Sequence, residues 1–248
     1  MALREELEKQ GAWLFRWRSY LPLLLLPVLL LALRNSEYLE QTVGDAAENL
    51  WEGFCATVSF LGLAVRCITV GYVPDGTSGT NKRAQRAETL NTTGMYSIVR
   101  HPLYLGNFII ILGISLFVQV WWLTLVAMLA FWLYYERIMF TEEEFLRNKF
   151  GNLYAEWARR TPLFVPKFKN WQPPSLVFSF RTVLRRESAG FFGIIVCFTF
   201  LEIIGDVLTE GKLELDLLWA ILLIISIITY LTLRILKKKT RLLNVEGR

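Results

Sequence analysis

Residues 103–135 read LYLGNFIIILGISLFVQVWWLTLVAMLAFWLYY and decide the fold class. They form two uncharged apolar runs, Leu103–Val118 and Val120–Tyr135, with only Gln119 between them. As a helix, each run covers about 24 Å, which is less than the ~30 Å hydrocarbon core of a bilayer. We therefore expect a tight helical hairpin in a membrane.

Four further apolar segments flank this hairpin, and the last two are expected to form a second hairpin. They are Leu21–Leu33, which contains Pro22 and Pro27, then Phe54–Val70, Gly190–Leu208 and Leu215–Leu236. The composition agrees, because 54% of the residues are hydrophobic and only 20% are charged, against about 25% charged residues in an average globular chain. The predicted fold is all-α: a polytopic transmembrane helix bundle of about six membrane segments with two helical hairpins.

The chain divides by composition into three parts. Residues 1–20 mix charges with Trp13 and Trp17, a pattern typical of an interfacial helix rather than a cleaved signal. Residues 21–186 are expected to form the main membrane domain, which carries long polar loops. Residues 187–248 are expected to form the C-terminal hairpin and a basic tail.

Loop charges predict the orientation. Residues 71–103 carry a net charge of +2 and residues 137–187 a net +5, whereas residues 34–52 carry −4 and residues 205–216 carry −3. Basic loops face the cytoplasm in membrane proteins, so both termini and the long loops are predicted to be cytoplasmic. The whole-chain charge of +5 is weak support for nucleic-acid binding, and we expect no nucleic-acid partner.

Metal and disulfide chemistry is not expected. The three cysteines form no CxxC pair, and His101 is the only histidine. An odd number of cysteines without metal-ligand spacing favours small buried apolar side chains.

The densest group of reactive side chains is residues 91–107, where a basic loop enters the first hairpin. Pro102 suits the first turn of a helix, which places Arg100 and His101 at a helix N-terminus, an end that favours anions. The i, i+4 spacing predicts Tyr104 on the same face as Arg100. The alternative is a structural role in which Arg100 snorkels, His101 caps the helix and Tyr104 joins an interfacial aromatic belt.

A second group follows the first hairpin. Glu142, Glu143 and Glu144 precede apolar residues at helical spacing, which predicts an amphipathic helix that ends before Pro162 and Pro166. Three consecutive acids near anionic lipid are unfavourable unless they meet a cation. A solvated first turn of a helix is the simpler alternative.

Together these groups resemble the integral membrane methyltransferases related to isoprenylcysteine carboxyl methyltransferase and the phospholipid methyltransferases. The shared order is G-x-Y-x-x-x-R-H-P-x-Y-x-G, an apolar hairpin, then E-E-x-x-L-x-x-x-F-G-x-x-Y, over roughly residues 54–168. The resemblance implies S-adenosylmethionine bound in cytoplasmic loops and a lipid acceptor that enters between helices. It implies a cofactor site lined by Tyr96, Arg100, His101, Pro102, Tyr104, Gly106, Glu142, Glu143 and Tyr154, among which Arg100, His101 and Glu143 are the expected catalytic residues.

The acceptor is expected to be a lipid phosphate. Residues 71–83 combine glycines and hydroxyls with Lys82 and Arg83, which suits a phosphorylated headgroup, although an ordinary flexible loop has the same composition. Arg66, inside a predicted span, is a further candidate for the headgroup. The loop and residues 90–94 resemble the bacterial branch that methylates the 1-phosphate of lipid A, which implies a bacterial inner membrane.

Other acceptors and activities remain open from the sequence. An ionised phosphate or carboxylate needs no strong base, whereas phospholipid N-methylation does, and only His101 and the three glutamates offer one. Prenyl-cysteine carboxyl methylation is the other close alternative. A different class is an NADPH-dependent sterol reductase, which the paired glutamates fit less well, and a third is a scaffold without enzymatic activity.

Overall fold

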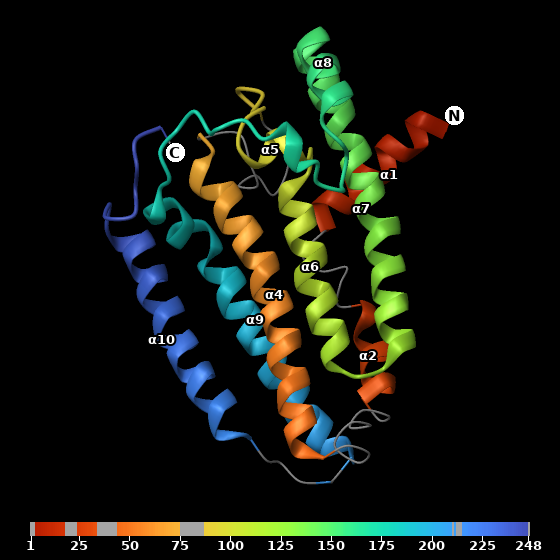
Figure 1. The fold of residues 1–248 in the computed structure, drawn as a ribbon, viewed down its shortest axis with the longest axis vertical. Coiled ribbons are helices and arrows are strands. Elements are labelled where there is room, and N and C mark those ends of the chain that lie inside the picture. The colour runs from red at the N-terminus through yellow and green to blue at the C-terminus, as the bar shows by residue number, and fades with distance from the viewer. Residues whose placement is uncertain are drawn as a thin grey trace.

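The computed structural model describes residues 3–17, 24–33, 44–74, 87–209, 211 and 215–247, and these contain helices and no strand. The elements pack side by side as a bundle (Figure 1). In order they are α1 (Leu3–Trp17), α2 (Leu26–Leu33), α4 (Asp45–Tyr72), α5 (Met95–Ile98), α6 (Pro102–Phe117), α7 (Trp121–Phe150), α8 (Asn152–Arg160), the 3-10 helix η2 (Phe168–Asn170), α9 (Phe180–Thr209) and α10 (Leu217–Lys239). The all-α prediction is confirmed.

Four helices, α4, α7, α9 and α10, are long and apolar enough to cross a membrane. Helix α6 is apolar but has only 16 residues, and α2 has eight. The predicted membrane bundle is therefore confirmed for four spans, while the total of six stays a prediction.

The first hairpin is confirmed. Helices α6 and α7 are joined by Val118–Val120, and Gln119 turns the chain with a φ of 61°. The amide side chain of Gln119 donates to Glu48 of α4 at 3.3 Å. The single polar residue between the two apolar runs therefore forms the turn itself.

The amphipathic helix predicted after this hairpin forms only in part, as α8 (Asn152–Arg160), which ends before Pro162 as expected, whereas its predicted first half belongs to α7. Helix α7 continues past Tyr135 to Phe150, because residues 136–150 contain no glycine or proline to stop it. The break comes at Gly151, whose φ of +53° favours glycine. Short helix α8 then carries the remaining apolar positions, Tyr154 and Trp157 among them.

The second hairpin also forms, but α9 begins ten residues before the expected Gly190. The Ser179 hydroxyl accepts the backbone N–H of Thr182 at 3.3 Å, as an N-cap does. The predicted domain boundary at 186/187 falls inside this helix. Helix α10 packs on α9, where Phe192 and Tyr230 stack with centroids 4.7 Å apart.

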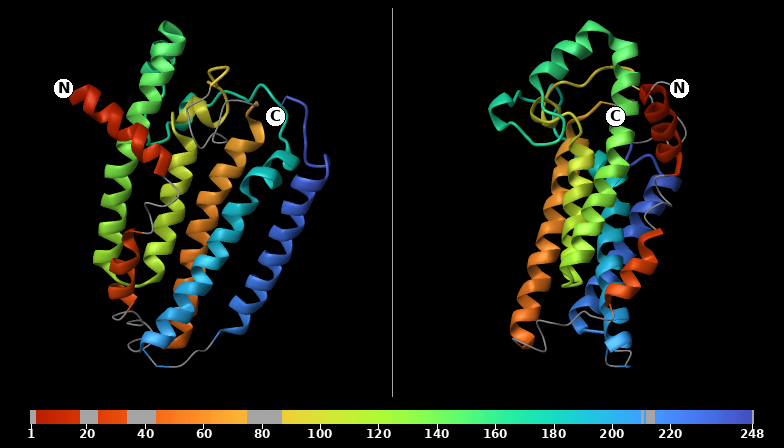
Figure 2. Two further views of the ribbon diagram at one scale, coloured as in Figure 1. Left: turned by 180° about the vertical axis from the view of Figure 1, so that it is seen from behind. Right: turned by 90° about the vertical axis from the view of Figure 1, so that its right-hand side faces the viewer.

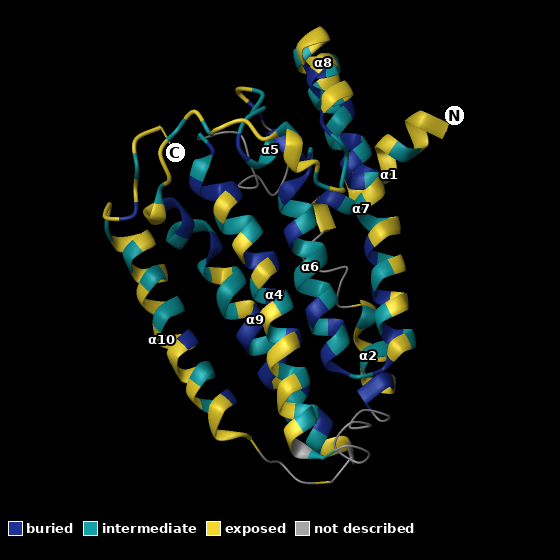
Figure 3. Cartoon of the chain, viewed as in Figure 1, coloured by how far each residue is buried: buried dark blue, intermediate teal, exposed yellow. Residues whose placement is uncertain are grey.

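The core lies where α4, α6 and α9 meet, and α10 is largely exposed (Figure 3). Helices α4 and α6 approach closely through glycines: a Cβ on Gly62 would lie 2.6 Å from the Gly106 carbonyl oxygen. One turn away, the Ser59 hydroxyl donates to the Ile110 carbonyl at 3.0 Å. Small residues permit such contact between membrane helices.

One end of the bundle gathers most of the polar structure. Helices α5 and α8, the segment 161–179 and both chain ends lie there, and the α6–α7 turn lies at the other end (Figure 2). Both ends on one side agree with the charge-based orientation, although the assignment of that side to the cytoplasm remains a prediction. Helix α1 packs there against α7, with Gly11 facing Thr141.

Candidate functional site

Glu143 of α7 is the centre of the polar cluster at this end. Its Oε2 accepts a hydrogen bond from Nη1 of Arg100 at 2.8 Å, and its Oε1 lies 2.7 Å from the same nitrogen and 3.1 Å from Nε2 of His101. All three side chains are mostly buried, with exposed fractions of 17%, 18% and 6% for Glu143, Arg100 and His101. The RHP and EE motifs, about 40 residues apart in sequence, therefore form one site.

Pro102 sets the positions of Arg100 and His101. It occupies the first turn of α6, as predicted, so Arg100 precedes the helix and His101 is its N-cap residue. The expected i, i+4 relation between Arg100 and Tyr104 was therefore wrong, because Arg100 is not helical. Tyr104 instead stacks on His101, with centroids 5.5 Å apart. The alternative role of His101 as a side-chain cap is also wrong, since no such hydrogen bond forms.

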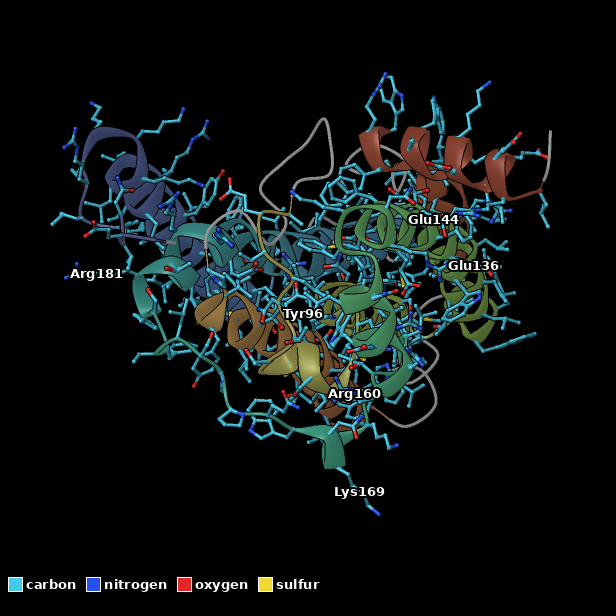
Figure 4. The ribbon with its side chains drawn as sticks, turned by 90° about the horizontal axis from the view of Figure 1, so that it is seen from above. Tyr96, Glu136, Glu144, Arg160, Lys169 and Arg181 are labelled. Atoms are coloured by element: carbon cyan, nitrogen blue, oxygen red, sulfur yellow. The ribbon has the colours of Figure 1, made fainter. Side chains whose placement is uncertain are left out.

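The three consecutive glutamates diverge. Glu143 binds Arg100 and His101, whereas Glu142 lies 3.7 Å from His101 Nδ1 and keeps a 34% exposed side chain. Glu144 pairs with Arg4 of α1, whose Nε donates to it at 3.0 Å, and Figure 4 shows Glu144 beside that helix. Successive residues of a helix point in directions about 100° apart, so each acid meets a different neighbour.

Tyr96 and Tyr154 form the aromatic wall of the site. The indole N–H of Trp157 donates to the Tyr96 carbonyl at 2.9 Å, and Tyr154 packs edge-on against Trp157. Burial, and next the charge of Glu142, raises the pKa of Tyr96. Burial, and next the charge of Glu143, raises that of Tyr154. Both hydroxyls therefore stay neutral donors at ordinary pH.

The segment after α8 covers this region. Three backbone N–H groups bond across the two segments: Gly94 to the Gln172 carbonyl, Lys167 to the Ile98 carbonyl, and Arg100 to the Pro162 carbonyl, each at 2.9 Å. Gly94 begins the inner segment with a φ of +59°, which favours glycine. These bonds fix the backbone of the segment that carries Tyr96, Arg100 and His101.

A second polar layer lies below the first, inside the bundle. Arg66 of α4 forms a fork with Glu187 of α9 at 2.7 and 2.9 Å, and its Nη1 donates to Asn107 at 2.6 Å. Asn107 in turn donates to the Tyr135 hydroxyl at 3.0 Å, and Tyr135 packs against Tyr104. Ring and hydrogen-bond contacts thus link His101 to Arg66.

The predicted site residues fall into three groups. Those brought together at the Glu143 cluster are Tyr96, Arg100, His101, Tyr104, Glu142, Glu143 and Tyr154. Pro102 starts α6, and Gly106 faces α4, where a Cβ would lie 2.5 Å from Arg66 Cγ. Lys82 and Arg83 lie outside the described residues.

The sequence analysis gave no role to Asn107, Tyr135 or Glu187, which form the deeper layer with Arg66. Asn107 and Glu187 carried a usable signal, because polar residues within apolar helices are rare and are commonly functional. Glu187 entered the sequence analysis only within the net charge of residues 137–187. Its partner Arg66 lies 121 positions away, so the pairing itself has no local signature.

The cluster offers polar groups for a cofactor that carries both a positive and a negative charge. Buried Nε of Arg100 and the buried hydroxyl of Tyr154 have no hydrogen-bond partner within the described part of the protein. Glu142 presents a partly exposed carboxylate beside them. No set of three metal-ligating side chains occurs among the described residues.

Comparisons with known proteins show similarity over the part of the chain that carries the motifs. Residues 75–153 match the phospholipid methyltransferase family model. Protein-S-isoprenylcysteine O-methyltransferase of Schizosaccharomyces pombe is 35% identical over 77 residues, which cover 31% of this chain and 33% of that protein. The corresponding enzyme B of Arabidopsis thaliana is 37% identical over 89 residues, which cover 34% of this chain and 43% of that protein.

A further relative carries a different name. The cobalt-zinc-cadmium resistance protein CzcN of Cupriavidus metallidurans is 34% identical over 125 residues, which cover 50% of this chain and 57% of that protein. The chain thus spans between a third and somewhat over half of the length of these relatives. No solved structure matches. The matched segment contains the whole Arg100–His101–Glu143 cluster, and over this segment the chain is similar to the phospholipid and isoprenylcysteine O-methyltransferases.

Proposed function

We propose that this chain is an S-adenosylmethionine-dependent methyltransferase that acts on a membrane lipid at the cytoplasmic face, in a bacterial inner membrane. The observation that carries the proposal is the buried Arg100–Glu143–His101 cluster inside the matched segment. Its position at the polar end of a membrane bundle suits a reaction between a soluble cofactor and a lipid.

The residues of the cluster fit this cofactor. Arg100 has an unused buried N–H, which suits a carboxylate, and Glu142 has a partly exposed carboxylate, which suits an ammonium group. Tyr154 adds a neutral hydroxyl. The same acidic surface is a poor match for the phosphates of a nucleotide cofactor, which disfavours the reductase alternative.

When bound, the cofactor supplies an electrophilic methyl group. The chain's own contribution is alignment, because a transfer between two positioned groups gains much of its rate from orientation. Glu143 holds Arg100 and His101 rigidly through three short contacts. Tyr104 and Tyr135 pack between His101 and the layer that contains Arg66, so they fix the position of one relative to the other.

The acceptor we favour is a lipid phosphate, such as the 1-phosphate of lipid A. Such an oxygen is already ionised and needs no base, and His101, the natural base, already contacts Glu143 and Tyr104. Arg66 offers cationic N–H groups below the cluster. Lys82 and Arg83 remain proposed phosphate ligands on sequence alone.

Prenyl-cysteine carboxyl methylation is the second candidate. The names of the yeast and plant relatives favour it, and a carboxylate has the same ionised character as a phosphate. Phospholipid N-methylation, which the family model's description suggests, requires a base, and the partly exposed carboxylate of Glu142 that could act as one is assigned here to the cofactor.

The test is incubation of the purified protein with methyl-labelled S-adenosylmethionine and three acceptors: lipid A, a prenylated cysteine and phosphatidylethanolamine. Mass spectrometry then locates the label. We expect it on a phosphate of lipid A, with a Glu143→Gln variant inactive and Gly193→Ala, at an open helical position, fully active. Label on the prenylated cysteine would show that this compound, and not lipid A, is the acceptor. If no acceptor is labelled and the protein binds no cofactor, the proposed function is refuted.

A further inference from the structure

Segment 161–179 forms a strap along the polar ends of the membrane helices. Near its start, the Pro162 carbonyl accepts the backbone N–H of Arg100, two residues before α6, at 2.9 Å. At its end, the Ser179 N–H donates to the Gly71 carbonyl, one residue before the end of α4, at 2.9 Å. Because α4 is long and apolar enough to cross a membrane, the strap lies at the level where this span ends. That level is the headgroup region of a bilayer.

Large apolar side chains of the strap are exposed instead of packed on the bundle. Val165, Phe168 and Trp171 are 76%, 75% and 47% exposed. In η2 the Trp171 N–H donates to the Phe168 carbonyl at 3.1 Å, and side chains three positions apart in a 3-10 helix are eclipsed. Phe168 and Trp171 therefore start from the same side of this turn. Exposed apolar side chains that gather in one place commonly mark a binding surface.

Basic side chains alternate with these apolar ones. Lys167 and Lys169 flank Phe168, and both are exposed. Residues 157–186 contain no aspartate or glutamate. Seen from above, Lys169 points away from the bundle at its outer edge, and Arg181 lies at another point of that edge (Figure 4). This distribution suits an anionic partner that lies beside the bundle.

A lipid surface fits these features better than a soluble protein does. Aromatic rings are enriched at the level of the headgroups, and lysine side chains can lie along apolar surface while their amines reach a polar region. An anionic leaflet attracts such basic segments. Lipid also surrounds a membrane bundle at this level, so a soluble partner would have to displace it.

The strap is tied to the candidate site. Besides the backbone bonds between the two segments, the Gln172 N–H donates to the Ser97 hydroxyl at 2.9 Å. Ser97 is buried directly after Tyr96, which belongs to the aromatic wall of the site. The position of the strap therefore sets the height of this wall relative to the membrane surface.

We propose that residues 165–171 are an interfacial anchor. Phe168 and Trp171 insert among the lipid headgroups beside the bundle, and Lys167 and Lys169 bind anionic phosphates of these lipids. The anchor thereby holds the strap, and through it the segment that carries Tyr96, at a fixed level of the bilayer.

The first test measures the reactivity of lysine amines in the full-length protein. Nanodiscs of phosphatidylcholine alone are compared with nanodiscs of an equal mixture of phosphatidylcholine and phosphatidylglycerol. A short treatment with a neutral acetylating reagent, followed by mass spectrometry, gives the labelling rate at each lysine. We expect the rates at Lys167 and Lys169 to fall about fivefold in the anionic discs, the effect of the attraction of one lysine to an anionic leaflet.

Lys149 is the control within the same molecule. It is exposed and lies one residue before the end of α7, which extends beyond the polar ends of the other membrane helices (Figure 1). Its labelling rate should be the same in both kinds of disc, because the attraction to a charged surface fades within a Debye length.

The second test locates Trp171 by comparing the wild type with Trp171→Phe, which retains an aromatic ring and the backbone bond of η2. The difference between the two fluorescence spectra isolates one of the nine tryptophans. We expect lipids that are brominated close to the headgroup to quench this difference signal. Acrylamide, a quencher dissolved in the water, should leave most of it.

Equal labelling rates of Lys167 and Lys169 in the two kinds of disc would refute the binding of anionic headgroups. Quenching of Trp171 by acrylamide and not by brominated lipid would show that the surface faces water, as a soluble partner requires, and would also overturn the proposal. If Trp171→Phe does not fold, the lysine comparison in the wild type still decides. Neither readout uses methyl transfer, so the anchor is tested independently of the proposed function.

Discussion

A Gly62→Ala substitution should separate helices α4 and α6. The added Cβ would lie 2.6 Å from the Gly106 carbonyl oxygen and 2.7 Å from the Ile110 nitrogen, about 0.8 Å short of the 3.4 Å at which contact becomes ordinary. Both obstacles are backbone atoms, so the helices themselves must move. Overpacking of this kind costs about 1–3 kcal/mol, and the lower entropy of the unfolded chain offsets roughly 0.5 kcal/mol.

The matched control is Gly53→Ala on the same helix, where nothing lies within 4 Å of the new Cβ. Its expected effect is a stabilisation of about 0.5–1 kcal/mol, because alanine favours helix. Measured in the same detergent, the unfolding temperature of Gly62→Ala should therefore be about 4 °C below that of the wild type. The unfolding temperature of Gly53→Ala should be slightly above it. Equal stability of the two variants would refute the close approach of α4 and α6.

The separation of α4 from α6 should also displace Arg66 in the candidate site. Arg66 lies four residues beyond Gly62, and its stem crosses Gly106. The rate of methyl transfer to the lipid should fall in Gly62→Ala. Cofactor affinity should be retained, because Arg100 and His101 directly precede α6 and Glu143 lies on α7, so none of the three is on α4. Lipid turnover at the wild-type rate would show that the position of α4 does not affect the acceptor.

Three further predictions concern the Glu143 cluster and the residues around it. Glu143→Gln should weaken cofactor binding at least tenfold in calorimetric titration, since it disrupts charge-assisted bonds worth about 1.5–3 kcal/mol, whereas Glu144→Gln, next to α1, should not; equal affinities would contradict the assignment. Trp157→Phe leaves the Tyr96 carbonyl without its donor and should lower the free energy of unfolding by about 1–3 kcal/mol; no loss would exclude a structural role for that bond. The raised pKa of Tyr154 means that the unfolded chain loses this proton first, so stability should fall as pH rises above the ordinary value of 10.0. Tyr154→Phe should flatten that fall in a series of unfolding temperatures, and an unchanged slope would contradict the burial of the hydroxyl.

The local features of the fold were predictable from the sequence. Apolar runs identify membrane helices because transfer into a bilayer is a property of each segment by itself. The α6–α7 turn at Gln119 and the start of α6 at Pro102 follow from single residues with strong local effects. The RHP and EE motifs likewise predicted residues that meet at Glu143 and, by resemblance, the methyltransferases to which this part of the chain is similar.

Helix ends without a strong local signal were predicted less well. The extension of α7 to Phe150 and the early start of α9 at Phe180 both cross from apolar into charged sequence. Hydropathy detects where the membrane ends, whereas a helix ends only where its backbone hydrogen bonding is interrupted, as at Gly151.

The sequence by itself determined a membrane helix bundle, its charge asymmetry and the motifs that meet at Glu143. Only the tertiary structure decided which charge meets which. Glu143 and Glu144 are neighbours in sequence, but one binds Arg100 and the other Arg4. Arg66 and Glu187 meet across 121 positions because close packing of α4 against α6 and α9 brings them together. Such pairings depend on helix packing and long-range geometry, which no local pattern of residues encodes.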